Sequence, residues 1–188
     1  QGNQLINWVA EIRDSEARMN DWNRPGRLED FLPTFADWRF DWLDVPALIT
    51  SAEHVFEYPM VDKDPLPRWS FERVTLMGDA AHPMYPRGSN GSAQALIDAR
   101  TLADEIATER AAGGDLRAAL QRYQAARLSA TARVVETNRT LPPDFIIMKA
   151  DELSGGKPFD NIDDLISQDE LRAISDNYKQ IAGFALKA

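Results

Sequence analysis

Cysteine is absent from the 188 residues of this chain, and histidine occurs only twice. The absence of cysteine excludes disulfide frameworks, catalysis by a thiolate and zinc sites with cysteine ligands. His54 and His82 lie far apart in the sequence, whereas a zinc site needs several nitrogen or sulfur ligands around one ion. We therefore predict no metal site.

Positive charge and long apolar runs are also scarce. The chain has 30 Asp and Glu against 21 Lys and Arg, a formal net charge of -9. Nucleic-acid binding is disfavoured, because it needs a basic patch. No apolar run approaches the ~20 residues that span a bilayer, and the opening QGNQLINWVAEIRD lacks the basic segment and apolar core of a signal peptide. We expect a cytoplasmic protein that binds no membrane.

An apolar fraction of 44% and five tryptophans indicate a globular protein, long enough for one domain or parts of two. Runs rich in β-forming residues predict strands over residues 5–12, 54–60 and 73–79. No strand precedes the first of these, which suggests that the beginning of the chain has been removed. Apolar periodicity and breaker residues predict a helix over 28–35 broken by Pro33 and a helical stretch over 40–52 interrupted at Pro46. They also predict helices from 92 to Gly113 and over 115–139, 162–166 and 168–184.

The most informative stretch is GDAAHPMYPRGSNGSAQALIDARTLA, which begins at Gly78. It predicts a loop between a strand and a helix. Gly88 and Gly91 permit close backbone approach and positive φ angles. The N–H groups of residues 89–92 lie at the start of the helix, where donors are unpaired and the dipole is positive. Asp79 can accept hydrogen bonds from ligand hydroxyls, so the loop suits a ligand with hydroxyls at one end and an anion-prone group at the other.

This stretch resembles the second flavin-binding motif of the FAD-dependent aromatic hydroxylases, the single-component flavoprotein monooxygenases related to p-hydroxybenzoate hydroxylase. The shared pattern is Gly-Asp-Ala-Ala-His, a proline before Gly-x-x-Gly, and a helix that carries alanine and aspartate. Shorter segments resemble the salicylate- and phenazine-hydroxylase branch: LINWVAE, YPMVDKDPLPRW, NRTLPPDFII and GGKPF.

The resemblance implies roles for individual residues. Gly78 would allow FAD to approach, and Asp79 would hold its ribityl hydroxyls. Pro86 would lie against the isoalloxazine ring, whose N1/O2 edge would receive backbone N–H groups from Gly88, Ser89, Asn90 and Gly91. NAD(P)H would reduce the flavin, O2 would react with it, and a small aromatic substrate would be hydroxylated. Because the cofactor carries this chemistry, we assign no catalytic residue. Three residues are candidates for the substrate pocket, with core packing as the alternative: Tyr58, Met60 and Tyr85.

The implied fold is α/β, the C-terminal half of a p-hydroxybenzoate hydroxylase-like FAD-binding fold with a mixed substrate-domain sheet and C-terminal helices. Residues 1–70 would belong to the substrate-binding domain, 71–140 to the FAD-binding domain and 141–188 to a C-terminal helical region. None of the ten glycines forms the G-x-G-x-x-G that binds the ADP half of FAD. We therefore expect a partner, the N-terminal half of the same enzyme, and poor FAD binding without it.

Two other functions stay open: a flavoprotein oxidase or dehydrogenase of the same fold, and an inactive, truncated binding module. The sequence also leaves open the aromatic substrate, the choice of NADH or NADPH and the oligomeric state. We expect His82 to hydrogen-bond backbone, and Asp98 to be a structural partner of Arg100 or of a neighbouring loop. Arg87 would attract an anionic substrate or NAD(P)H, or else form a salt bridge in solvent.

Overall fold

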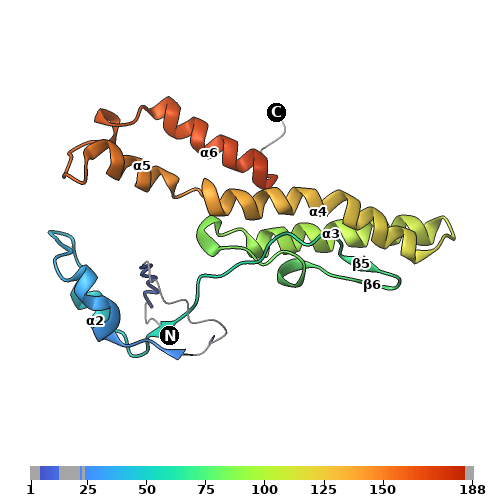
Figure 1. Ribbon diagram of the computed structural model, residues 1–188, viewed down its shortest axis with the longest axis horizontal. Helices are drawn as coiled ribbons and strands as arrows, with labels where there is room; N and C mark the ends of the chain where they lie inside the picture. Colours follow the sequence, from blue (N-terminus) through green and yellow to red (C-terminus); the bar gives the residue numbers. More distant parts are fainter. Residues whose placement is uncertain (1–4, 13–21, 23, 185–188) are drawn as a thin grey trace. The chain divides into compact units, whose positions relative to one another are not determined.

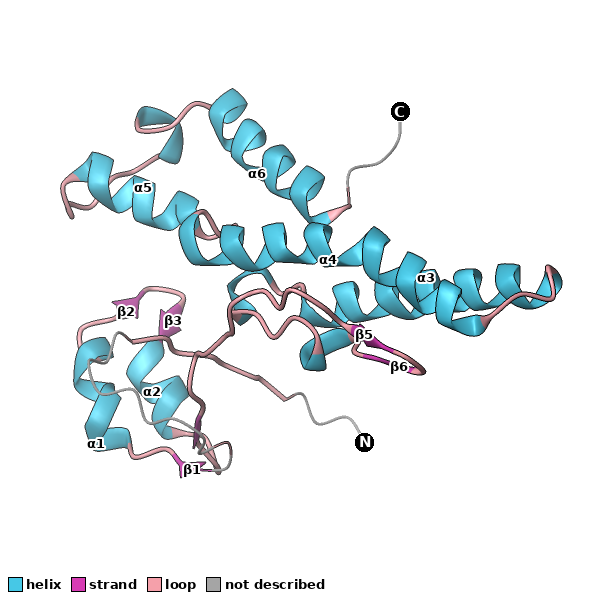
Figure 2. Cartoon of the chain, turned by 45° about the vertical axis from the view of Figure 1, so that its right-hand side comes forward, coloured by secondary structure: helices cyan, strands magenta, loops and turns pink. Residues whose placement is uncertain are grey.

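The computed structural model describes residues 5–12, 22 and 24–184, which are coloured along the sequence in Figure 1. They divide into two units with a boundary between Pro59 and Met60. Both units combine helices with short antiparallel strand pairs, drawn in cyan and magenta in Figure 2. The described residues are therefore mixed α/β. The p-hydroxybenzoate hydroxylase-like features of the predicted fold stay a prediction.

The first unit contains two strand pairs, each of two-residue strands, and short helices. Pro46 is the second residue of α2 (Val45–Thr50), where the helix needs no N–H donor, so proline is compatible with the first turn of this helix. The predicted interruption at Pro46 is wrong. The carboxylate of Asp44 caps the same helix by accepting a 2.8 Å hydrogen bond from the Ala47 N–H. The elements are β1 (Arg24–Pro25) paired with β4 (Phe56–Glu57), β2 (Arg39–Phe40) paired with β3 (Leu43–Asp44), α1 (Leu28–Phe31), the 3-10 helix η1 (Leu32–Phe35) and α2 (Val45–Thr50).

Two strand predictions in this unit need correction. Residues 5–12 form no strand, and Leu5 is 95% exposed. A β-forming run becomes a strand only where a neighbour supplies ladder hydrogen bonds, and no described residue pairs with this run. In the second run, 54–60, only Phe56 and Glu57 are paired, because the partner strand β1 has just two residues.

The second unit is built on two long helices, α3 and α4, which pack side by side and connect through Gly113, whose φ is +67°. The predicted helix from residue 92 to Gly113 is confirmed within two residues at each end, and the predicted helix over 115–139 is confirmed within one. Figure 1 shows α6 next to α4, in agreement with the contacts between them. The helices are α3 (Gly91–Ala111), α4 (Leu116–Thr140), α5 (Phe145–Ser154) and α6 (Gln168–Ala182), with 3-10 turns η2 (Gly78–Ala80), η3 (Pro86–Gly88) and η4 (Ile162–Asp164).

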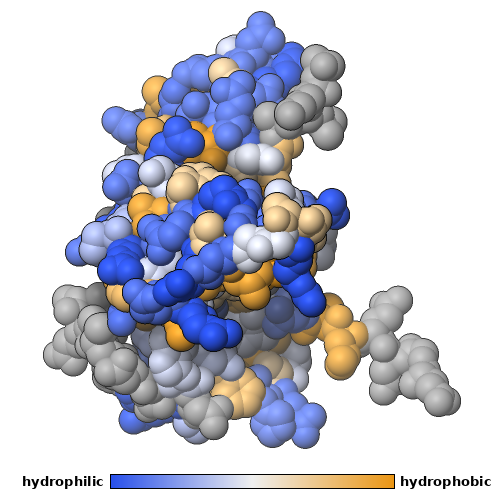
Figure 3. Space-filling view, turned by 90° about the vertical axis from the view of Figure 1, so that its right-hand side faces the viewer, coloured by the Kyte–Doolittle hydropathy of each residue, from blue (hydrophilic) through white to orange (hydrophobic). Residues whose placement is uncertain are grey.

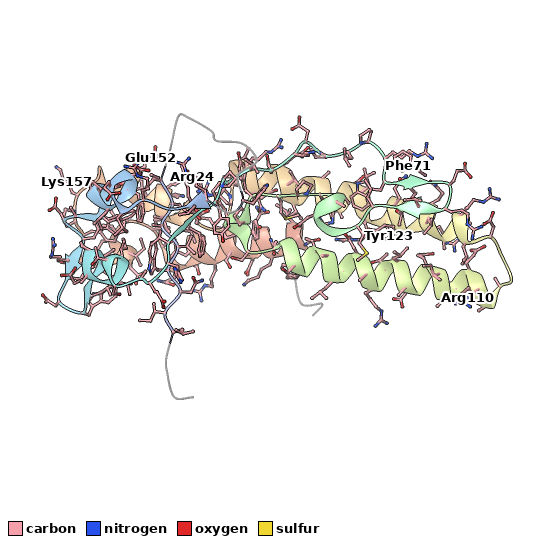
Figure 4. All side chains as sticks on the ribbon, turned by 90° about the horizontal axis from the view of Figure 1, so that it is seen from below. Arg24, Phe71, Arg110, Tyr123, Glu152 and Lys157 are labelled. Atoms are coloured by element: carbon pink, nitrogen blue, oxygen red, sulfur yellow. The ribbon has the colours of Figure 1, made fainter. Side chains whose placement is uncertain are left out.

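The predicted strand over 73–79 is shorter than expected. Only Val74–Thr75 forms a strand, β6, which pairs with β5 (Ser70–Phe71) in a hairpin. The backbone is still extended at Met77 and turns into η2 at Gly78. Trp69 and Tyr123 form the buried core beneath this hairpin with Ala81. The Tyr123 hydroxyl donates a 3.1 Å hydrogen bond to the carbonyl of Leu76, and Figure 4 labels Tyr123 and Phe71 in this region.

The surface exposes both polar and apolar side chains (Figure 3). On the face in Figure 3, hydrophilic residues predominate and apolar residues are scattered among them. Among the helices of residues 5–12, 22 and 24–184, none combines the length and the apolar character needed to cross a bilayer.

Candidate functional site

An open cavity of about 510 Å³ lies where η2, η3 and the start of α3 meet. We call it the loop cavity. Most of the residues predicted to bind a cofactor line it, although they come from separate parts of the motif. The lining comprises Asp79, Met84, Pro86, Ser89, Asn90, Gly91, Ser92 and Ala95. Met84, Ser92 and Ala95 were not predicted, but Ala95 follows Gly91 by one helical turn and could have been found from that spacing.

Asp79 and Gly91 face the free space of this cavity. A Cβ atom added at Gly91 would meet a single neighbour within 4 Å, the Oδ1 atom of Asp79 at 3.8 Å. Asp79 is exposed, and no described residue donates a hydrogen bond to its carboxylate. Both features leave the carboxylate and the Gly91 backbone accessible to a ligand.

The N-terminus of α3 is not capped by the residue that precedes it. Asn90 lies at the cap position, but its side-chain amide donates a 2.5 Å hydrogen bond to the Tyr178 hydroxyl and makes no capping bond. The N–H groups of the first turn have no partner within the helix, and the dipole gives this end a partial positive charge. The loop cavity is therefore suited to an electron-rich group.

Gly88 does not line the loop cavity and is required by internal packing instead. A Cβ atom at this position would overlap the Tyr178 hydroxyl and would lie 2.9 Å from the Oδ1 atom of Asn138. Gly78, the remaining predicted residue, is buried with φ at +58°, and a Cβ there would lie 3.3 Å from that of Ala95. A glycine is thus needed at both positions for reasons within the protein.

A buried polar network fixes η2 against α3 and α4, with Asp98 at its centre. The Asp98 carboxylate accepts hydrogen bonds from the Gly78 N–H at 3.0 Å and from Nε of Arg127 at 2.8 Å, and lies 2.6 Å from Nε2 of His82. Burial alone would raise the pKa of Asp98, but the hydrogen bonds from His82, Arg127 and Gly78 outweigh it and lower this pKa. Asp98 is therefore a charged anchor for the loop.

These contacts decide three of the predictions. Asp98 is a structural partner of a neighbouring loop, as expected, but not of Arg100, which pairs with Asp104 at 2.7 Å. The His82 side chain bonds this buried carboxylate, so the predicted bond to backbone is wrong. Arg87 forms a salt bridge, at 2.8 Å from Asp144, and both side chains are partly exposed.

The three candidates for a substrate pocket are divided between the two units. Tyr58 belongs to the first unit and is 58% exposed, whereas Met60 and Tyr85 belong to the second unit. Neither Met60 nor Tyr85 lines the loop cavity. The backbone carbonyl of Tyr85 accepts a 3.1 Å hydrogen bond from the Asn138 amide. Their role at a substrate stays a prediction.

Comparison with known proteins identifies the cofactor. Residues 56–138 match the FAD binding domain family. Over 141 residues, 73% of this chain and 34% of the relative, the sequence is 50% identical to a phenazine 1,6-dicarboxylic acid hydroxylase of Lysobacter antibioticus. A 3-amino-4-hydroxybenzoate 2-monooxygenase of Streptomyces platensis is 38% identical, over 75% of this chain and 34% of the relative. An FAD-dependent monooxygenase of Hypoxylon pulicicidum is 34% identical, over 70% and 28% respectively.

These matches confirm the resemblance to FAD-dependent aromatic hydroxylases and FAD as the cofactor. The chain spans about a third of the length of these relatives. The loop cavity lies entirely within the segment that matches the FAD binding domain.

Proposed function

We propose that this chain forms the flavin-ring side of the FAD site in a monooxygenase that hydroxylates a small aromatic substrate with NAD(P)H and O2. The observation that carries the proposal is the loop cavity, in which the exposed Asp79 carboxylate and the uncapped start of α3 face one open space. Two relatives are named as a hydroxylase and a monooxygenase of aromatic compounds, which supports the reaction class.

FAD would supply the electron transfer and the oxygen chemistry, and the residues of the chain would bind and orient it. Asp79 would accept hydrogen bonds from the ribityl hydroxyls. The backbone N–H groups at Ser89, Asn90 and Gly91 would donate to the edge of the ring that becomes negative on reduction. A helix N-terminus stabilises a nearby negative charge by about 0.3–1 kcal/mol, and by up to about 2 kcal/mol in partly buried sites. The start of α3 would thus favour the reduced cofactor.

Three further assignments complete the proposed site. We assign the ADP half of FAD to an N-terminal half of the same enzyme, because this chain has no G-x-G-x-x-G. Pro86 lines the loop cavity and would lie against the isoalloxazine ring. Tyr58, Met60 and Tyr85 are the candidates for contact with the aromatic substrate.

The cofactor assignment is tested by titrating FAD into the complete gene product carrying Asp79→Ala, with Asp151→Ala as the control. Both aspartates are exposed, so neither substitution should lower the unfolding temperature. Loss of hydrogen bonds to the ribityl chain should raise the Kd for FAD about tenfold or more in Asp79→Ala alone. Equal affinities in the two variants would overturn the assignment.

The reaction class is tested separately in the wild-type protein loaded with FAD. A monooxygenase should oxidise NAD(P)H faster when its aromatic substrate is present and convert the reducing equivalents into hydroxylated product. Peroxide as the sole product with every aromatic compound tried would favour an oxidase instead.

A further inference from the structure

We propose that α6 acts as a clasp on the cofactor loop, with Tyr178 as the positioning residue that holds residues 86–91 in the shape that receives FAD. The α6 clasp comprises Tyr178, Asn90 and Asn138. The inference rests on the proposed function for its link to FAD, whereas the contacts of the clasp are made by the protein's own residues.

The Tyr178 hydroxyl joins the loop to α4 by two hydrogen bonds. It accepts from Nδ2 of Asn90 at 2.5 Å and donates to Oδ1 of Asn138 at 2.6 Å. The Asn138 amide continues the chain by donating to the carbonyl of Tyr85, on the other side of η3. The Tyr178 hydroxyl therefore bonds one end of the loop directly, at Asn90, and is connected to the other end through Asn138.

All three side chains of the α6 clasp are buried. Asn90 is 3% exposed, Asn138 is 0% exposed and Tyr178 is 8% exposed. In such surroundings a lost hydrogen bond leaves a polar group that water does not reach, which is more unfavourable than the same loss at the surface. Burial also raises the pKa of Tyr178, so the hydroxyl keeps its proton and stays a donor near neutral pH.

Ser89, within the loop, has a backbone conformation that serine does not favour by itself. Ser89, between Gly88 and Asn90, has φ at +50°, in the left-handed region that residues other than glycine seldom occupy. Such a conformation persists only when the surroundings fix it. The hydroxyl of Tyr178 contacts the residues on both sides, since it fills the space beside Gly88 and bonds Asn90.

A second contact sets the position of α6. The side-chain amide of Gln94, 1% exposed on α3, donates a 2.8 Å hydrogen bond to the carbonyl of Ala182. Tyr178 and Ala182 are one helical turn apart, so both face α3 from the same side of α6. This fixes the hydroxyl relative to the first turn of α3, where the proposed flavin edge would lie.

The test compares Tyr178→Phe with Tyr123→Phe, which also removes a buried hydroxyl from this unit but does not touch the loop. Amide hydrogen exchange is measured without FAD. We expect exchange at residues 88–91 to rise about tenfold or more in Tyr178→Phe, with no such local rise in Tyr123→Phe. Unchanged exchange at the loop, or a rise spread evenly over α3 and α4, would overturn the clasp.

A second variant covers the case in which Tyr178→Phe unfolds. Asn90→Ser loses the reach to Tyr178 but supplies a good helix cap, so α3 should stay folded. It should raise exchange at residues 88–91 relative to the wild type, and unchanged exchange would contradict the clasp. If Tyr178→Phe folds, the double variant should add little, because both changes break the same contact. Additive effects would contradict the clasp.

The link to FAD has its own readout, the Kd for FAD in the complete gene product. Tyr178→Phe should raise it about tenfold relative to Tyr123→Phe. If the wild type binds FAD and these two variants bind it equally, the link is wrong and the proposed function stands. If the wild type does not bind FAD, the proposed function and the link both fail, and the exchange experiment alone decides the clasp.

Discussion

Nε2 of His82 lies 2.6 Å from Oδ2 of Asp98, and both side chains are buried. The same carboxylate accepts a hydrogen bond from Arg127, on α4, and from the backbone of Gly78. The Asp98 carboxylate, on α3, thereby connects three parts of the unit: His82, Gly78 at the start of η2, and helix α4. The network positions η2, and with it Asp79, at the rim of the loop cavity.

Replacing Asp98 with Asn should destabilise the second unit by about 3 kcal/mol, because the buried guanidinium of Arg127 loses its charged partner. The folded-state pKa of Asp98 is lowered, so its contribution is fully present above about pH 4, the usual aspartate value. It is lost as the pH falls through the folded-state pKa.

Urea unfolding of the wild type and of Asp98→Asn between pH 7 and pH 2.5 checks this. The difference in unfolding free energy should stay constant near neutral pH and shrink below about pH 4. A difference that does not depend on pH would show that the charge of Asp98 contributes nothing.

The glycines at positions 88 and 91 should respond in opposite ways to alanine. Gly88→Ala places a methyl group where the Tyr178 hydroxyl lies, so we expect a loss of about 1–3 kcal/mol in unfolding free energy. Gly91→Ala lies in open space in the first turn of α3, and we expect folding to be unchanged or stabilised by about 0.4–1 kcal/mol.

Titration of FAD into Gly91→Ala tests whether a ligand lies close to this position. Under the proposed function, the methyl group of Gly91→Ala fills space that the flavin needs, so the Kd should rise while the protein stays folded. Wild-type affinity in Gly91→Ala would argue against close approach of a ligand at this position.

Gln124 should stabilise the hairpin of the second unit through its side-chain carbonyl. Its Oε1 atom accepts hydrogen bonds from the N–H groups of Trp69 at 2.7 Å and Ser70 at 2.8 Å. Gln124→Leu leaves both donors without a partner and should lower the unfolding free energy by about 2 kcal/mol. Gln124→Glu keeps an acceptor of the same length and should lose less in the same urea unfolding experiment. Equal losses would mean that the hydrogen bonds contribute little.

Local features of the structure could be predicted from the sequence. The motif that begins at Gly78 indicated a loop followed by a helix, and α3 starts at Gly91 as glycine, serine and the apolar period suggest. The pair Gly113-Gly114 correctly marked the end of that helix, because a positive φ is needed there. Such signals depend on residues close together in the chain, which one sequence contains in full.

Other features depend on distant partners and were missed. Residues 5–12 have the composition of a strand, but pairing is decided by segments elsewhere, so composition was misleading. Helix α5 lies in the predicted C-terminal helical region, 141–188, but its bounds were not predicted. The reason for glycine at position 88 was also hidden, since the atom that requires it belongs to Tyr178, 90 residues later.

The wide sequence separation within the α6 clasp has a consequence for the order of folding. The loop around Ser89 is made long before Tyr178 leaves the ribosome, yet two of its hydrogen-bonding groups, those of Asn90 and Tyr85, depend on contacts completed by α4 and α6. Contacts between segments so far apart form late, because the intervening chain must first be ordered. A nascent chain halted before α6 should therefore already contain the α3–α4 pair while the loop around Ser89 is still unformed. Under the proposed function, FAD would bind only after α6 has been made.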